Sequence, residues 1–143
     1  MSDTVEREQR SRIMSRVGGK NTKPELHVRF LLHRMGFRFR LHRRDLPGRP
    51  DIVLPRHRKV IFVHGCFWHG HEGCRRSARP TSNVDFWNRK LDRNIERDRK
   101  AVDDLRSLGW KTLIVWECET KNLDVLTRRL EAFLRVSADL QRD

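Results

Sequence analysis

The spacing of hydrophobic residues changes along the chain between helix-like and strand-like patterns. A basic, helix-compatible stretch from Arg7 to Val17 is followed by two glycines that interrupt the pattern. A second helix is predicted to begin at Thr22, because Thr-Lys-Pro-Glu is typical of a capping box with proline in the first turn. Gly36 would end this helix, and its apolar stripe would consist of Leu26, Phe30, Leu31 and Met35.

Short apolar runs between turn residues predict strands. Residues 37–41 alternate apolar and basic side chains, whereas 52–54 and 60–63 are almost wholly apolar and would form a buried hairpin through 55–58. A strand at 112–116 is predicted between helices at about 85–108 and 123–136. The apolar face of the longer helix would carry Trp87, Leu91, Ile95, Val102 and Leu105. This order predicts an α/β fold with a central mixed sheet flanked by helices, preceded by a basic arm or helix at 1–20, with 21–143 as one domain.

The charge of the chain favours a polyanionic partner. Lys and Arg number 32 against 19 Asp and Glu, which gives a net charge of +13 and a pI near 11.1. The basic residues are spread along the sequence, and no apolar run approaches the ~20 residues that span a bilayer. Nucleic acid is therefore favoured over a membrane surface, although charge alone does not distinguish DNA from RNA.

One short segment concentrates thiols, imidazoles and large aromatic side chains. Cys66, His71 and Cys74 have a spacing that lets them meet at one ion, and the strand at 112–116 could deliver Cys118 as a fourth ligand. A Cys3His set would fill the coordination sphere of Zn²⁺, so the zinc would be structural. The alternative is that the cysteines are small buried hydrophobes and His71 a surface residue.

Asp51 is the acidic residue most suited to catalysis. It begins a buried strand, where an unpaired carboxylate is costly, and Mg²⁺ is a suitable partner for it. The predicted hairpin would place His64, and the loop that leads to His69, beside Asp51. The alternative is that Asp51 pairs with Arg49 or caps a turn.

Four segments carry a resemblance to a known family. They are Leu46 to Asp51, Ile61 to His69, Asn94 to Asp98 and Leu113 to Cys118. In this order they resemble the very short patch repair endonucleases, over a region from about Arg10 to Cys118. The resemblance implies a restriction-endonuclease-like fold and nicking of DNA beside the T of a T:G mismatch left by deamination of 5-methylcytosine.

The resemblance also implies residue roles. Asp51 and the backbone carbonyl of Val63 would hold Mg²⁺, His69 would act as general base or position the water, and His64 and Glu25 would be further active-site residues. The structural zinc ligands would be Cys66, His71, Cys74 and Cys118. Beside the mismatch, Phe67, Trp68 and Trp87 would intercalate from the major groove, with Met14 approaching from the minor groove.

Some positions depart from the family pattern or have simpler explanations. The acid-x-Lys triplet of related restriction enzymes is replaced by Phe62-Val63-His64, so a histidine must take the part of the lysine, and Val63 stands where some members have Thr. Glu25 could serve helix stability alone, and Trp87 could belong to the core. The clustered histidines could be second-shell or surface groups, and the register around His71 is less secure than that of the cysteines.

These observations lead to a magnesium-dependent mismatch endonuclease with a structural zinc, acting as a monomer on double-stranded DNA. Accessory mismatch-repair proteins are candidate further partners. The odd number of cysteines and the polar N-terminus predict a reducing cytosol. The resemblance implies a bacterial cytoplasm, with the protein at the nucleoid when bound to DNA. The alternatives are a non-catalytic, zinc-stabilised DNA-binding module and a dimeric restriction-type enzyme that cuts both strands.

Overall fold

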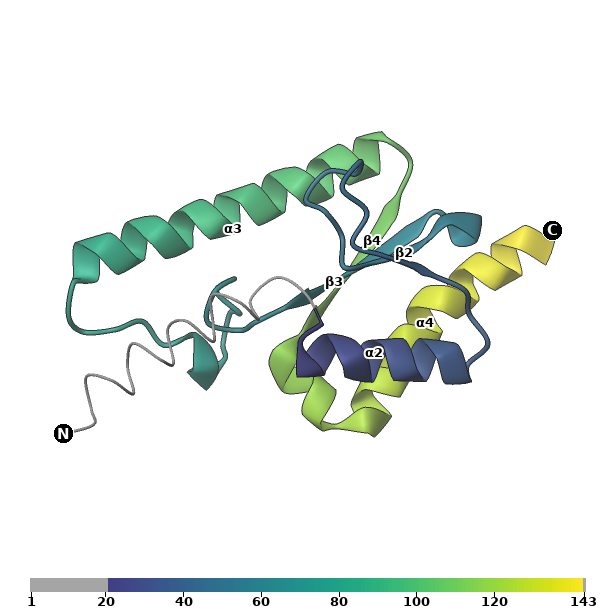
Figure 1. The fold of residues 1–143 in the computed structure, drawn as a ribbon, viewed down its shortest axis with the longest axis horizontal. Helices are drawn as coiled ribbons and strands as arrows, with labels where there is room; N and C mark the ends of the chain where they lie inside the picture. The colour runs from purple at the N-terminus through teal and green to yellow at the C-terminus, as the bar shows by residue number, and fades with distance from the viewer. Residues whose placement is uncertain (1–20, 143) are drawn as a thin grey trace.

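The computed structural model describes residues 21–142 and shows helices on both sides of a sheet (Figure 1). The predicted leading helix and Met14 lie outside the described residues. The elements in chain order are α2 (Lys23–Arg34), β1 (Arg40–Leu41), β2 (Ile52–Leu54), β3 (Lys59–His64), α3 (Val84–Ser107), β4 (Lys111–Trp116) and α4 (Leu123–Arg142), with 3-10 turns η1 (Pro55–His57), η2 (Arg75–Ser77) and η3 (Glu117–Lys121).

The sheet is mixed, as the sequence predicts. Its strand order is β1-β2-β3-β4, in which β1, β2 and β3 pair antiparallel and β3 pairs parallel with β4. Arg58 closes the β2–β3 hairpin in the left-handed region, with φ of 50°. The parallel pairing requires a long crossover, which α3 provides. The α/β class and the central mixed sheet are therefore confirmed.

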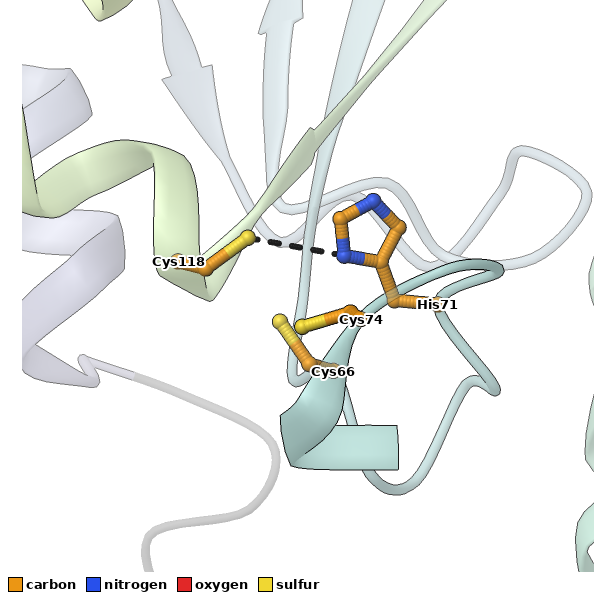
Figure 2. A group of neighbouring side chains, drawn as sticks. All are labelled: Cys66, His71, Cys74 and Cys118. Carbon is orange, nitrogen blue, oxygen red and sulfur yellow. Dashed lines mark hydrogen bonds between the residues drawn. The ribbon is translucent and has the colours of Figure 1, made fainter. Parts of the chain in front are cut away.

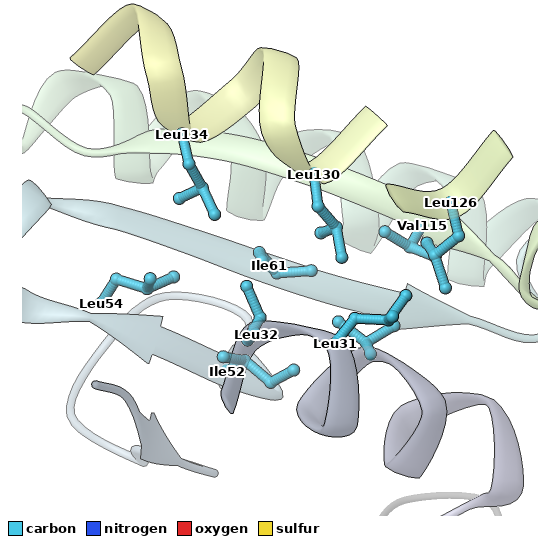
Figure 3. Close-up of a cluster of buried hydrophobic side chains, with 10 residues drawn as sticks. Leu31, Leu32, Ile52, Leu54, Ile61, Val115, Leu126, Leu130 and Leu134 are labelled. Carbon is cyan, nitrogen blue, oxygen red and sulfur yellow. The ribbon is translucent and has the colours of Figure 1, made fainter. Parts of the chain in front are cut away.

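Alternating side chains of the central strands separate two cores. Ile52 and Ile61 face α2 and α4, where ten buried residues form the larger cluster, including Leu130 of α4 (Figure 3). Val53 and Val60 point to the opposite face and pack with Leu46, Phe62, Ala101, Leu105 and Trp110, under α3. Each strand therefore buries both faces, which accounts for its nearly continuous apolar sequence.

Two sequence-based predictions about α2 and β1 are wrong in detail. The strand expected at 37–41 is limited to Arg40–Leu41, although Phe37 and Phe39 still pack against the larger core. The buried face of α2 is formed by Glu25, Val28, Leu31 and Leu32, whereas Leu26 and Phe30 of the predicted stripe are 46% and 58% exposed. The prediction failed because the buried face of α2 includes the Glu25 carboxylate. A hydrophobic pattern assigns such a charged residue to the solvent-exposed face.

The predicted capping box is only half formed. The backbone N–H of Glu25 donates to Thr22 Oγ1 at 3.3 Å, as an N-cap requires. The Glu25 carboxylate does not return to the N-cap but contacts Arg29 and His42. Helix capping alone therefore does not explain the position of the Glu25 carboxylate.

No helix in the described part of the chain is long and apolar enough to cross a membrane.

Candidate active site and metal centre

Asp51 lies where β2 begins beside the end of β3. The antiparallel register brings the two segments together, and the Val63 N–H donates to Asp51 Oδ2 at 2.7 Å. Burial raises the pKa of Asp51 to about 6; the Val63 hydrogen bond opposes this shift, Glu25 adds to it, and His42 and His69 oppose it. The carboxylate is therefore poorly compensated in the protein alone, which suits a cation ligand.

Two predicted histidines stack beside this site. The rings of His64 and His69 have centroids 3.8 Å apart and lie 7° from parallel. Burial, with a further contribution from His69, lowers the pKa of His64 to about 3, so His64 is neutral at physiological pH. It therefore offers a polar nitrogen, and not a positive charge, to the site.

His69 is oriented by an acidic partner that the sequence interpretation did not assign. Its Nδ1 lies 2.7 Å from Asp98 Oδ2 on α3. Because an ionised carboxylate only accepts hydrogen bonds, Nδ1 carries the hydrogen and Nε2 is left free to accept a proton. The pair has the arrangement of a general base held by a carboxylate.

The position of Asp98 could have been found from the helical pattern. Leu91, Ala101 and Leu105 are the buried residues of α3, and Asn94 and Asp98 fall on the same face at helical spacing. Asn94 donates to the Trp68 carbonyl at 3.1 Å, next to the Asp98–His69 contact. Polar residues that interrupt an apolar stripe in this way indicate contacts with a polar site.

Glu25 reaches the same region from α2. It is 1% exposed, contacts Arg29, and lies 2.9 Å from His42 Nε2 through its Oε2. Ligand atoms of Glu25, His42 and Asp51 all lie within 4.8 Å of one another. The sequence interpretation included Glu25 but missed Arg29 and His42, because nothing in their spacing distinguishes them from the other basic residues.

The four predicted zinc ligands come together in space (Figure 2). In the parallel β3–β4 pair, His64 lies opposite Trp116, so Cys66 and Cys118 each follow two residues later at the same edge of the sheet. The loop after β3 adds His71 and Cys74. The structure therefore gathers all four residues, as the spacing and the strand end predicted.

The geometry of this cluster fits a tetrahedral ion. Ligand atoms of the four residues lie within 4.8 Å of one another, and Cys118 Sγ is 3.4 Å from His71 Nδ1. Zn–S and Zn–N bonds at tetrahedral angles would separate these two atoms by about 3.6 Å. Burial raises the pKa of Cys66 to about 12, so a cation is needed to hold it as the thiolate. The donor set could hold a metal of the zinc type.

The predicted aromatic residues form one cluster between the metal loop and the start of α3. Ring centroids are 5.1 Å apart for Phe67 and Trp68, 5.6 Å for Phe67 and Trp87, and 6.0 Å for Trp68 and Trp87. The cluster extends to Phe86, which is 55% exposed and was missed by the sequence interpretation. Trp87 is partly exposed and lies in this cluster rather than in either core.

Comparison with known proteins assigns the family. The family described as DNA mismatch endonuclease Vsr matches residues 2–76. The chain is also 50% identical over 134 residues to the Type II nicking enzyme V.XorIIP of Xanthomonas oryzae pv. oryzae, covering 94% of this chain and 98% of that protein. The chain belongs to the Vsr family of DNA mismatch endonucleases.

Other relatives have similar coverage. The Type II nicking enzyme V.NmeAIP of Neisseria meningitidis is 42% identical over 97% of this chain and 99% of its own length. The DNA mismatch endonuclease Vsr of Escherichia coli is 40% identical over 94% of this chain and 88% of its own length. Membership of the Vsr family confirms the prediction of a DNA-nicking endonuclease over that of a non-catalytic module.

Proposed function

We propose that this Vsr-family endonuclease nicks one strand of double-stranded DNA beside the T of a T:G mismatch, such as deamination of 5-methylcytosine leaves, with Mg²⁺ as cofactor. The observation that carries the proposal is a pair of neighbouring side-chain groups: Asp51 with Glu25 and His42, and His69 with His64 and Asp98. His69 is close enough to Asp51 to lower the pKa of its carboxyl, against the larger effect of burial. The name of the Escherichia coli relative, a DNA mismatch endonuclease, supports the same substrate class. In this proposal the protein is a monomer with a restriction-endonuclease-like domain at 21–143 and a DNA-binding arm at 1–20.

The residues of the two groups have separate roles in the proposed reaction. Asp51 and the Val63 carbonyl would hold Mg²⁺, which when bound supplies positive charge at the scissile phosphate. His69 accepts a proton from the attacking water at Nε2, while Asp98 fixes its tautomer through Nδ1. His64 orients His69 by stacking against it. Glu25 has a ligand atom within 4.8 Å of one of Asp51 and would act beside it.

We assign selection of the mismatch to the aromatic cluster. Phe67, Trp68 and Trp87 can enter between base pairs, and unstacking costs least where the pairing is already poor. Lys90 lies 5.9 Å from the Trp68 ring centroid and adds positive charge beside the cluster. Met14, proposed to act from the minor groove, lies outside the described residues.

We assign Zn²⁺ to the Cys3His cluster as a structural ion. Four protein ligands leave no position for water, so this centre would hold the aromatic loop and would not take part in hydrolysis. The support is the convergence of Cys66, His71, Cys74 and Cys118 from the ends of two paired strands. Metal binding there would contribute directly to folding stability.

The catalytic role of Asp51 can be tested with a labelled T:G duplex and Mg²⁺. Asp51→Ala should abolish nicking while binding of the duplex is retained, because the ligand is lost and the DNA-contacting groups remain. Asp103→Ala, at an exposed acidic position on α3, is the matched control and should nick as the wild type does. Nicking by Asp51→Ala would refute the assignment, and double-strand breaks in matched DNA would favour the restriction-type alternative.

A further inference from the structure

His42 has a backbone conformation that a non-glycine residue rarely adopts. It follows β1 with φ of 51°, in the left-handed region. That conformation is strained for an L-residue, although histidine is among the residues enriched there. Strain of this kind persists where neighbouring structure fixes the residue, and it occurs often at functional sites.

Two contacts fix His42 between the Glu25 carboxylate and the backbone of Asp51. Its backbone N–H donates to the Asp51 carbonyl oxygen at 3.0 Å. Its Nε2 lies 2.9 Å from Glu25 Oε2. His42 therefore links the side chain of a residue on α2 to the backbone of Asp51, the residue immediately before β2.

Arg29 also lies 3.5 Å from His42 Nε2 through its Nη2, but none of its hydrogen bonds among the described residues reaches the Asp51 segment. It contacts Glu25 from four residues further along α2, so it fixes the Glu25 carboxylate relative to its own helix. Among the hydrogen bonds of the described residues, the His42 contacts are those that join Glu25 to the Asp51 segment. Loss of the imidazole would leave Glu25 attached to α2 but not to Asp51.

We propose that His42 is a positioning residue that holds the Glu25 carboxylate beside Asp51, so that both carboxylates face the same divalent cation. This inference rests on the proposed metal-binding role of Asp51. Ligand atoms of the three residues lie within 4.8 Å of one another, a separation that one ion can bridge.

The first test measures binding of Mn²⁺, a paramagnetic substitute for Mg²⁺, by electron paramagnetic resonance in the absence of DNA. His42→Ala should weaken Mn²⁺ binding by about 10-fold or more, as loss of a residue that orients a metal ligand typically does. His42→Gln should restore affinity to within about 3-fold of wild type, since its amide can donate to Glu25. Ala and Gln are equally strained at this φ, so their difference reports the side-chain hydrogen bond. His33→Ala, at an exposed position on α2, is the control.

The second test is a double-mutant cycle on nicking rate and Mg²⁺ requirement. His42→Ala should raise the Mg²⁺ concentration for half-maximal nicking and lower kcat without changing DNA affinity. In a Glu25→Ala background the same substitution should have little further effect, because His42 acts through Glu25. Unchanged Mn²⁺ binding in His42→Ala, failure of Gln to rescue, or additive effects with Glu25→Ala would overturn the proposal. A wild-type protein that does not nick would instead refute the proposed function, and Mn²⁺ binding would then decide the role of His42 alone.

Discussion

Replacement of Asp51 by asparagine should stabilise the metal-free protein at neutral pH. The folded structure raises the pKa of Asp51 from an ordinary 3.8 to about 6, chiefly through burial. Ionisation of this carboxyl therefore opposes folding. The side-chain oxygen of asparagine can still accept the Val63 N–H, so the substitution removes the charge and keeps the hydrogen bond.

The expected stability difference depends on pH in a defined direction. Well below pH 3.8 the carboxyl is neutral in the folded and the unfolded protein, so it makes no difference to stability. As pH rises from 3.8 through about 6, the unfolded state ionises first, and the free-energy cost of ionising Asp51 in the folded protein develops fully. The free energy of unfolding of Asp51→Asn should therefore exceed that of wild type by about 1–2 kcal/mol at pH 5 and by up to about 3 kcal/mol at pH 7.5. A bound divalent cation would compensate the charge, so Mg²⁺ should stabilise wild type and reduce the difference.

Urea denaturation followed by tryptophan fluorescence measures this effect. Wild type and Asp51→Asn are compared at pH 5 and 7.5, with and without Mg²⁺, and Asp103→Asn serves as the exposed control. At each pH the compared proteins have the same thiol ionisation and the same zinc content. These contributions therefore cancel in the difference between their free energies of unfolding. An Asp51→Asn variant that is no more stable than wild type at pH 7.5, or whose advantage does not grow with pH, would refute the account of Asp51 as an uncompensated buried carboxylate.

Three further substitutions test other parts of the site. Asp98→Asn should lower kcat by roughly 10- to 100-fold with unchanged DNA affinity, because His69 loses the partner that fixes its tautomer, and an unaltered single-turnover rate would contradict this role. Cys118→Ser should reduce bound zinc, measured by atomic absorption, and lower Tm; retention of about one zinc per chain, or loss of zinc without a change in Tm, would argue against a structural site. Trp68→Ala should weaken binding of T:G duplexes by about 1–3 kcal/mol in a fluorescence anisotropy titration, and an equal loss on T:A duplexes would show that the ring does not select the mismatch.

Local sequence patterns predicted most of the architecture. The buried strands β2 and β3 are short apolar runs separated by turn residues, and the helix α3 ends at Ser107, shortly before Gly109, so their positions follow from the local sequence. Convergence of Cys66 and Cys118 also followed from the prediction that both come after strand ends. The parallel in-register pairing of β3 and β4 explains why that prediction was correct.

The missed features depend on tertiary contacts. The face of α2 was misassigned because Glu25 is buried by its contacts with His42 and Arg29, and no hydrophobic pattern reports such a pair. Asp98 lies 29 residues from His69 in the sequence, so only the folded structure shows their contact, although its place on the apolar face of α3 was an available indication. The strand at 37–41 was overextended because Phe37 packs against the core without pairing in the sheet.

Mapping the nick on matched duplexes shows directly whether the enzyme cuts one strand at a T:G mismatch. Duplexes that differ only in carrying T:G, T:A or C:G at one position, each labelled separately on either strand and placed in several flanking sequences, are incubated with the wild-type protein and Mg²⁺. We expect a single nick beside the T, on the T strand of the T:G duplex, with the other strand intact and the T:A and C:G duplexes uncut. Equal nicking of the three duplexes, or no nicking of T:G in any flanking sequence while binding persists, would contradict this expectation.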